Sequence, residues 1–439
     1  MINAILPKAK VTAGLRGSGW NPARMERPYT LKPFALRTAD NQRTLGFLYT
    51  QTGNETTVVC TMHPREFSGT PYLVPDVLDA GCACWVQAPR SIGNDLRLEH
   101  ELAILDVAAA VSHLKKLGFK RIILMGISGG AGLYAFYAQQ ALRAPQDRIA
   151  TTPAGRPVKL AEADMPAPDG LVFVSPHPGQ GRLLMNGIDP SVTDENNVFS
   201  IDPALDPFSE ANGFRPAPES SSYSAEFVER YKAAQRARVQ RLDDRAQAAI
   251  KEKAKTRKQF KQLQEEGAAI PPQLRMQVAH TPIYQVWRTD ADLRCWDLSI
   301  DPSHRELGTL WGRDPYTSNF GSVGFARLVT AESWLSTWSG ISSNASFEKC
   351  GPELTLPTLM LEYTGDQAAF PSDMDAIYAS IAASDKQRHE VRGNHHGQAL
   401  AEGEESGQIL AGRIIQQWLR SKELSSAELG RISDTGERR

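Results

Sequence analysis

The chain has 439 residues, of which 41% are hydrophobic and 23% are charged, and its formal net charge at pH 7 is −1. This is the composition of an ordinary globular protein, and the near-zero charge gives no electrostatic reason to expect nucleic-acid binding. No apolar run approaches the ~20 residues that span a bilayer, and no apolar segment precedes a signal-peptide cleavage site. We therefore expect a cytoplasmic protein with no membrane partner.

The cysteines are few and odd in number, at five, which is not typical of a disulfide framework. Cys82 and Cys84 fall in one predicted strand, where the alternation of side chains puts both on the same face. We expect them to be buried, reduced thiols. A metal site would need more ligands at tighter spacing, so the sequence predicts no metal.

The first part of the chain alternates strands with helices. Two segments, 29–36 and 45–50, are expected to open the fold as an antiparallel pair. The strands that follow are predicted at 56–62 and 83–87, from residue 121 onward, and at 170–174, with helices at 72–80, 96–117 and 133–143. Alternating units of this kind predict an α/β fold, in which helices cover both faces of a mostly parallel sheet.

The alternation stops between about Gln180 and Gly351 and then resumes. The late elements are a strand at 355–363, a helix at 373–383, a short strand at 388–392 and a closing helix at 406–421. We therefore divide the chain into two parts of one core, residues 1–179 and 352–439, separated by an insertion at 180–351.

A long helix is predicted within the insertion, from Ala225 to Glu266, with one apolar and one basic face. The basic face consists of arginine and lysine residues: Arg236, Arg238, Arg241, Arg245, Lys251, Lys253 and Lys255. Because acidic residues are mixed in, we interpret this face as solvated, or as a contact in a homodimer, rather than as a site for nucleic acid or anionic lipid. The insertion is also rich in tryptophan, which favours a bulky or aromatic substrate group, unless these side chains belong to the core.

The run from Arg121 to Gly132 joins an apolar strand to the sequence Gly126-Ile-Ser128-Gly-Gly130, and a helix follows directly. A nucleophile elbow needs this context, because it places a serine on a sharp, strained turn between strand and helix. The small residues on either side let the two backbones pass closely. Ser128 is therefore the predicted nucleophile; the alternative is a glycine-rich turn with a capping serine.

A serine hydroxyl needs a base to take its proton and a third group to orient that base. The predicted acid is Asp366, in a glycine turn just past a late strand, although an Asx turn that caps the next helix is the alternative. Glu362, inside the strand, and Asp373, in the helix, are weaker candidates. The predicted base is one of His395 and His396, which adjoin in a glycine-flanked loop after the last strand.

An oxyanion hole needs two N–H donors aimed at the developing negative oxygen. Gly129, directly after the nucleophile, is expected to supply one of them. The second should come from the loop after the early strand, where Pro64 has no N–H, so Arg65 is the predicted donor. Since ligands of such sheets bind outside the carboxyl ends of the strands, four polar residues are candidates for the substrate pocket: His63, Arg90, Asn94 and His177.

These motifs resemble the α/β-hydrolase family over roughly residues 50–178 and 355–420. The resemblance rests on the elbow at Ser128, on Asp366, on the histidine pair, and on a His63-Pro64 turn where many members carry His-Gly. It implies an eight-stranded, mostly parallel sheet and a mainly helical lid inserted after the sixth strand. The insertion falls at that place but is larger than a typical lid.

The resemblance also implies a choice between the two histidines. Family members commonly place the base three residues after a glycine, so Gly393 selects His396, with His395 as the second choice. The acid loop before Pro371 is about one residue shorter than the usual family pattern.

Together the residues predict a serine hydrolase that cleaves a small-molecule carboxylic ester or thioester through an acyl-enzyme on Ser128, without a cofactor. Two alternatives stay open. The same triad could cleave a carbon–carbon bond in a diketone or ring-cleavage product of aromatic catabolism, with Arg65, Arg90 and His177 as the extra polar groups. The fold could also bind a ligand with little turnover. Haloalkane or epoxide chemistry usually takes an aspartate at the elbow, so Ser128 argues against it.

Overall fold

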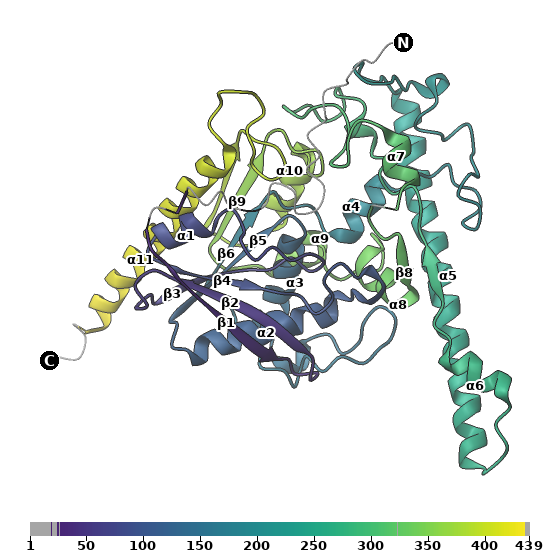
Figure 1. Cartoon of the computed structure of the whole chain (residues 1–439), viewed down its shortest axis with the longest axis horizontal. Coiled ribbons are helices and arrows are strands. Elements are labelled where there is room, and N and C mark those ends of the chain that lie inside the picture. The colour runs from purple at the N-terminus through teal and green to yellow at the C-terminus, as the bar shows by residue number, and fades with distance from the viewer. Residues whose placement is uncertain (1–18, 20–23, 26, 323, 435–439) are drawn as a thin grey trace.

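A mixed sheet occupies the centre of the computed structural model, which describes residue 19, residues 24–25, 27–322 and 324–434, with side chains as far as residue 422 (Figure 1). Its strands are β1 (Thr30–Arg37), β2 (Arg43–Thr50), β3 (Thr57–Thr61), β4 (Ala83–Gln87), β5 (Arg121–Ile127), β6 (Gly170–Val174), β9 (Thr358–Tyr363) and β10 (Lys386–Val391). Their spatial order is β1-β2-β4-β3-β5-β6-β9-β10.

Strand directions follow the prediction from the sequence. β2 pairs antiparallel with β1 and with β4, whereas every other neighbouring pair in the sheet is parallel. The residues of β3, β4 and β6 are all buried, as expected for parallel strands that are covered on both faces. The predicted opening antiparallel pair and the mostly parallel sheet are confirmed.

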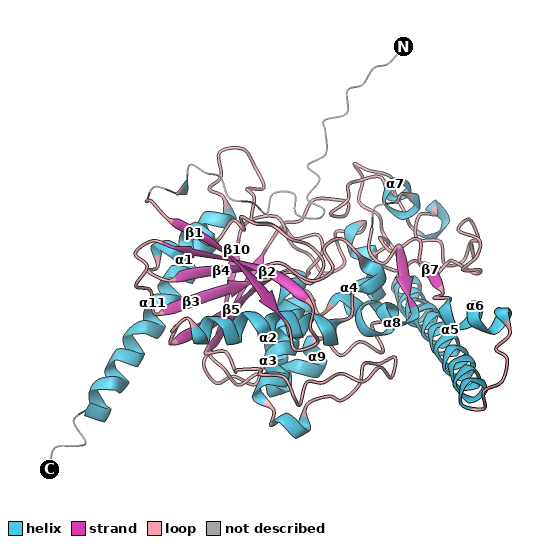
Figure 2. Cartoon of the chain, turned by 60° about the horizontal axis from the view of Figure 1, so that its bottom comes forward, coloured by secondary structure: helices cyan, strands magenta, loops and turns pink. Residues whose placement is uncertain are grey.

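Helices cover both faces of this sheet (Figure 2). They are α1 (Val74–Asp79), α2 (His100–Lys116), α3 (Gly129–Leu142), α10 (Pro371–Ser380) and α11 (Gly407–Asp434), which runs past its predicted end at Ser421. Strand β5 shows how the sequence divides its residues between the two layers. Ile122 and Leu124 pack with α2 and α3, while Ile123 and Met125 pack with α1 and α11. The period of two that marks a strand thus supplies one apolar core to each face.

Most of the regular structure in the segment between β6 and β9 is helical. It contains α4 (Gln180–Gly187), α5 (Ala225–Glu265), α6 (Pro272–Ala279), β7 (Ile283–Gln285), α7 (Pro315–Phe320), β8 (Leu328–Thr330), α8 (Ala331–Ser333), a π-helical turn (Trp334–Trp338) and α9 (Phe347–Cys350). Short 3₁₀ turns lie in this segment at Glu210–Asn212, Leu293–Cys295 and Gly351–Glu353. Two more lie before β6, at Asp95–Arg97 and Pro145–Asp147. Both views show α5 extending away from the central sheet (Figures 1 and 2).

The basic face of α5 is not uniformly solvated. Arg238 is fully buried, donates two hydrogen bonds of 2.8 Å to the Glu195 carboxylate, and donates a third to the carbonyl of Asp189. It therefore fastens the first half of α5 to the loop after α4, which corrects the prediction for this residue. Lys251, Lys253 and Lys255 belong to the second half of the helix, where most side chains are exposed. A homodimer through this helix stays a prediction.

All five cysteines are buried and none forms a disulfide, which agrees with the prediction of buried, reduced thiols at Cys82 and Cys84. Within the part of the chain that the structure describes, none of the helices combines the length and apolar character that a bilayer-spanning segment needs. The described residues also contain no group of three or more His, Cys, Asp or Glu side chains arranged to hold a metal ion.

Candidate active site

Ser128 lies on a strained turn between β5 and α3. Its backbone has φ 53° and ψ −122°, a conformation that non-glycine residues rarely adopt. Strand β5 and helix α3 approach so closely that a Cβ on Gly126 would lie 2.5 Å from the Cα of Ala131. Helix α3 is equally close to the residue that follows β3, because a Cβ on Gly130 would lie 2.4 Å from the carbonyl oxygen of Met62. The two glycines of the motif are therefore required by packing, and the turn has the geometry of a nucleophile elbow.

Asp366 follows β9, in the loop that leads into α10. Its Oδ1 accepts hydrogen bonds from the backbone N–H groups of Ala368 at 2.7 Å and Ala369 at 3.1 Å. Its Oδ2 faces the ring of His395. Oδ1 therefore makes the contacts expected of a turn-capping aspartate. Oδ2 makes the contact expected of an aspartate that orients a histidine. Because the backbone holds Oδ1, the side chain cannot rotate without losing both bonds.

The loop after β10 carries the two adjacent histidines. The hydroxyl of Ser175, just past β6, donates to the carbonyl of His395 at 3.0 Å. The side-chain oxygen of Asn394 accepts from the N–H groups of His396 at 3.1 Å and Gln398 at 3.0 Å. The N–H of Gly397 closes the turn on the Asn394 carbonyl at 2.7 Å. This compact turn sets the direction of each histidine.

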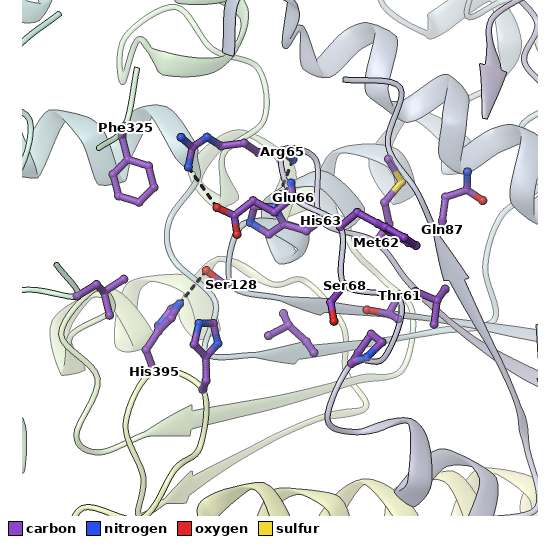
Figure 3. A pocket seen from close by; sticks show the side chains of 16 residues that line it. Thr61, Met62, His63, Arg65, Glu66, Ser68, Gln87, Ser128, Phe325 and His395 are labelled. Atoms are coloured by element: carbon purple, nitrogen blue, oxygen red, sulfur yellow. Dashed lines mark hydrogen bonds and ion pairs between the residues drawn. The ribbon is translucent and has the colours of Figure 1, made fainter. Parts of the chain in front are cut away.

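The three predicted residue types meet at His395. Its Nδ1 lies 2.8 Å from Oδ2 of Asp366. Its Nε2 lies 2.9 Å from Oγ of Ser128, and Figure 3 shows this second contact. Since the carboxylate can only accept, Nδ1 carries the proton and donates it to Asp366, which leaves Nε2 to accept from the serine hydroxyl. Both Asp366 and His395 are buried.

This geometry contradicts the prediction that His396, rather than His395, is the base. The ring of His396 packs edge-on against that of His395, with centroids 4.8 Å apart, and lines the same pocket. The spacing rule counts residues from Gly393, but the hydrogen bonds of the turn place His395 between serine and acid. The second choice of the sequence is the residue in contact with both.

A pocket opens over Ser128 and encloses about 780 Å³, part of it open to solvent. Its apolar lining comes from Phe67, Pro71, Val86, Ile127, Leu310 and Phe325, and its polar lining includes Thr61, Glu66, Ser68 and Gln87. Leu310 and Phe325 come from the insertion, whereas the other lining residues come from the core. Burial raises the pKa of the Glu66 carboxyl above its ordinary value. The described lining contains no tryptophan.

His63 lines this pocket, as predicted, but it also changes the expected oxyanion hole. Its Nδ1 accepts from the backbone N–H of Arg65 at 3.2 Å and from that of Glu66 at 3.0 Å. The N–H of Arg65, the predicted second donor, is therefore already engaged. The guanidinium of Arg65 pairs with Asp95 at 2.6 Å and stands over the ring of Phe325. Arg65 is thus a structural tie between the loop after β3 and the insertion.

Two other predicted pocket residues lie elsewhere. Arg90 forms ion pairs with Asp106 at 2.8 Å and Asp40 at 2.6 Å, so its charge is used within the fold. Asn94 is exposed and does not line the described pocket. Both residues follow a strand, as predicted, but neither lines the described pocket.

His177 is almost completely buried and is not part of the pocket lining. Its Nδ1 accepts from the N–H of Gly179 at 3.3 Å. Burial, assisted by repulsion from His395, lowers the pKa of His177 to about 3, so its ring is neutral near pH 7. It is a packed residue behind the site rather than a substrate contact.

No protein-family model matches the chain, and no curated protein matches its sequence. Among solved structures, the chain is similar to an esterase domain from Rhodothermus marinus, with 9% identity and a TM-score of 0.39 over 89% of this chain and 98% of that one. It is similar to a Pyrococcus furiosus esterase with 12% identity and a TM-score of 0.42, over 91% and 94%. It is also similar to a carboxyl esterase from Tuber melanosporum, with 12% identity and a TM-score of 0.40 over 92% of this chain and 90% of that one.

The structure's own topology defines the class. The eight-stranded order with β2 antiparallel, the two helical layers, and the strained serine between β5 and α3 together constitute the α/β-hydrolase fold. The fold that the sequence resemblance implied is confirmed.

Proposed function

We propose that this protein is a serine hydrolase that cleaves a carboxylic ester or thioester through an acyl-enzyme on Ser128. The observation that carries the proposal is the hydrogen-bonded series from Asp366 through His395 to Ser128, with distances of 2.8 and 2.9 Å, at the base of a pocket. Nucleophile, base and orienting acid in this order are what acyl transfer by serine needs.

The proposed reaction begins when Oγ of Ser128 attacks the substrate carbonyl and Nε2 of His395 takes the hydroxyl proton. The Asp366 carboxylate stabilises the imidazolium that forms and holds the ring in place. The imidazolium then gives its proton to the leaving alcohol or thiol as the tetrahedral intermediate collapses. A water molecule, deprotonated by the same Nε2, attacks the acyl group and releases the acid. The backbone N–H of Gly129, at the start of α3, donates to the oxyanion.

The pocket lining supports a bulky or aromatic small molecule as substrate. Phe67 and Phe325 supply aromatic surfaces, and Val86, Ile127 and Leu310 supply aliphatic ones. Burying an apolar acyl or alcohol group against this wall removes it from water, which favours binding. The tryptophans make a different contribution, because Trp296, Trp334 and Trp338 are buried in cores of the insertion.

The carbon–carbon hydrolase alternative finds little support among the described residues. It drew on Arg65, Arg90 and His177 as extra polar groups near the serine. The Arg65 guanidinium is paired with Asp95, Arg90 with two aspartates, and His177 is buried outside the pocket lining. An ester or thioester needs none of these groups.

Labelling with a fluorophosphonate probe tests the proposal, with wild type beside Ser128→Ala and the intact mass as readout. A panel of p-nitrophenyl esters with acetyl, hexanoyl and phenylacetyl groups then measures turnover. We expect one adduct on wild type, none on the variant, and hydrolysis that depends on Ser128. A folded wild-type protein that gives neither adduct nor turnover would contradict the proposal and favour a ligand-binding role.

A further inference from the structure

The second backbone donor predicted for the oxyanion hole, the N–H of Arg65, is already engaged in another hydrogen bond. This inference rests on the proposed function, because it concerns the negative oxygen formed when Ser128 attacks a carbonyl. Gly129 offers its N–H at the start of α3. In the loop after β3, where the second donor is expected, Pro64 lacks an N–H, and the N–H groups of Arg65 and Glu66 both donate to Nδ1 of His63.

Two side-chain nitrogens, one from a loop and one from the start of a helix, converge on Gly129 instead. A Cβ placed on Gly129 would lie 2.6 Å from Nε2 of His63 and 3.1 Å from Nε2 of Gln180. His63 belongs to the loop after β3, and Gln180 is the first residue of α4. The absence of a side chain at position 129 thus leaves room for both nitrogens beside the backbone that follows the nucleophile.

Gln180 has a polar group with nothing to bind. The residue is 3% exposed, and its Nε2 is buried without a hydrogen-bond partner. A buried amide N–H that lacks an acceptor costs free energy, so such groups in native structures call for an explanation. A substrate oxygen that becomes negative in the transition state is an acceptor of the kind this group lacks.

His63 presents a proton on the same side. Because its Nδ1 accepts two backbone N–H bonds, the ring proton of the neutral form is on Nε2, the nitrogen nearest Gly129. Burial, and then the nearby Arg65 cation, hold the pKa of His63 well below its ordinary value. The ring therefore stays neutral and acts as a fixed hydrogen-bond donor, distinct from the proton-carrying His395.

We propose that the oxyanion is held by the Gly129 N–H together with two side-chain donors, Nε2–H of Gln180 and Nε2–H of His63. The three donors come from α3, α4 and the loop after β3. Since α4 is the first helix of the insertion, the insertion contributes directly to catalysis as well as to the pocket wall.

Gln180→Leu is the central test, measured with the p-nitrophenyl ester that wild type hydrolyses best. Leucine keeps much of the volume and removes an amide whose Nε2 has no hydrogen-bond partner in the resting protein. We expect kcat to fall by about 10²- to 10³-fold, as for removal of one oxyanion donor, while KM stays within about twofold. The Tm should be unchanged or higher, because an unsatisfied buried group is lost. Gln273→Leu, on exposed α6, is the matched control and should behave as wild type.

Two His63 variants distinguish the loss of the Nε2–H donor from the loss of the contacts that Nδ1 makes with the loop after β3. His63→Asn keeps an acceptor near the position of Nδ1 and has no donor near Nε2, so kcat should fall by about 10²-fold or more. His63→Gln restores an N–H near the position of Nε2 and should recover at least tenfold of that loss. A purely structural role for His63 would give the opposite order, because asparagine preserves the bonds to Arg65 and Glu66.

Ser128→Ala in the same assays keeps this inference separate from the proposed function. Ser128-dependent turnover with wild-type kcat in both Gln180→Leu and His63→Asn would overturn the side-chain oxyanion hole and leave the hydrolase standing. Loss of kcat in Gln180→Leu together with a clear drop in Tm would also overturn it, by making Gln180 a packing residue. Absence of Ser128-dependent turnover in wild type would overturn the hydrolase, and the inference with it.

Discussion

Asp366 gives its two carboxylate oxygens different tasks with respect to His395. Oδ2 lies 2.8 Å from Nδ1 of the ring, while Oδ1 is held by two backbone N–H groups of its own loop. Only an acceptor can take the place of Oδ1 on these two N–H groups. An amide substituted for the carboxylate must therefore turn its oxygen toward them and its NH₂ group toward His395.

Asp366→Asn is therefore expected to abolish most activity without disturbing the fold. The asparagine oxygen stays on the N–H groups of Ala368 and Ala369, so its NH₂ group faces Nδ1 of His395. The ring must then accept at Nδ1 and carry its proton on Nε2, where it cannot take the proton of Ser128. We expect kcat to fall by about 10⁴-fold. Ester kinetics measure the loss of activity, and thermal unfolding tests whether the fold is undisturbed. A variant that keeps a tenth of wild-type kcat would contradict the assignment of Asp366 as the orienting acid.

The two histidines are expected to differ sharply when replaced one at a time. His395→Ala removes the group in contact with both Ser128 and Asp366, so fluorophosphonate labelling of Ser128 should fall by at least 10³-fold. His396→Ala removes a wall of the pocket and should mainly raise KM. The labelling rate and ester kinetics of both variants decide the matter. Loss of labelling in His396→Ala with retention in His395→Ala would reverse the assignment.

Much of the fold follows from local patterns in the sequence. The alternation of Ile122 to Met125 identifies β5, and an apolar run followed by Gly-x-Ser-x-Gly identifies the elbow, because both signals lie within a few consecutive residues. Ser128 and Asp366 could be predicted from their positions relative to the strands. Each follows a strand whose carboxyl end must reach the same edge of the sheet.

The parts that the sequence did not predict depend on contacts between distant segments. The choice of His395 over His396 comes from hydrogen bonds that Asn394 makes within one turn. The engagement of the Arg65 N–H depends on how the His63 ring folds back. The contribution of Leu310 to the pocket depends on how the insertion packs over the core. No local periodicity records such contacts.

Gly130 and Gly132 are expected to respond in opposite ways to alanine, although they lie two residues apart in α3. A Cβ on Gly130 would lie 2.4 Å from the backbone oxygen of Met62, whereas the nearest atom to a Cβ on Gly132 lies at 3.5 Å. Gly130→Ala should destabilise the protein by about 1–3 kcal/mol, because backbone must move. Gly132→Ala should be neutral or slightly stabilising, since alanine favours helix over glycine. Denaturant unfolding of both variants measures the difference. Equal stabilities would contradict the close approach of β3 and α3.

Acid should destabilise the protein in part through His100, which lies at the start of α2. Its ring is buried, both ring nitrogens lack hydrogen-bond partners, and burial lowers its pKa from 6.5 to about 4. The unfolded chain therefore binds a proton near pH 6.5 that the folded chain refuses until about pH 4. The contribution of this residue to stability is fully present above pH 6.5 and is lost as the pH falls, by about 2 kcal/mol at pH 5.

His100→Gln removes this titration and should flatten the decline of stability below pH 6.5. The neighbouring Glu99 acts in the other direction, since burial raises its pKa to about 7 and its contribution is lost as the pH rises from about 4.5 to 7. The informative quantity is therefore the difference in unfolding free energy between wild type and His100→Gln, measured at several pH values from 4.5 to 8, because Glu99 is common to both proteins. We expect this difference to be constant above pH 7 and to shift in favour of the variant at lower pH. A difference that does not change with pH would show that His100 is as easily protonated in the folded chain as in the unfolded one.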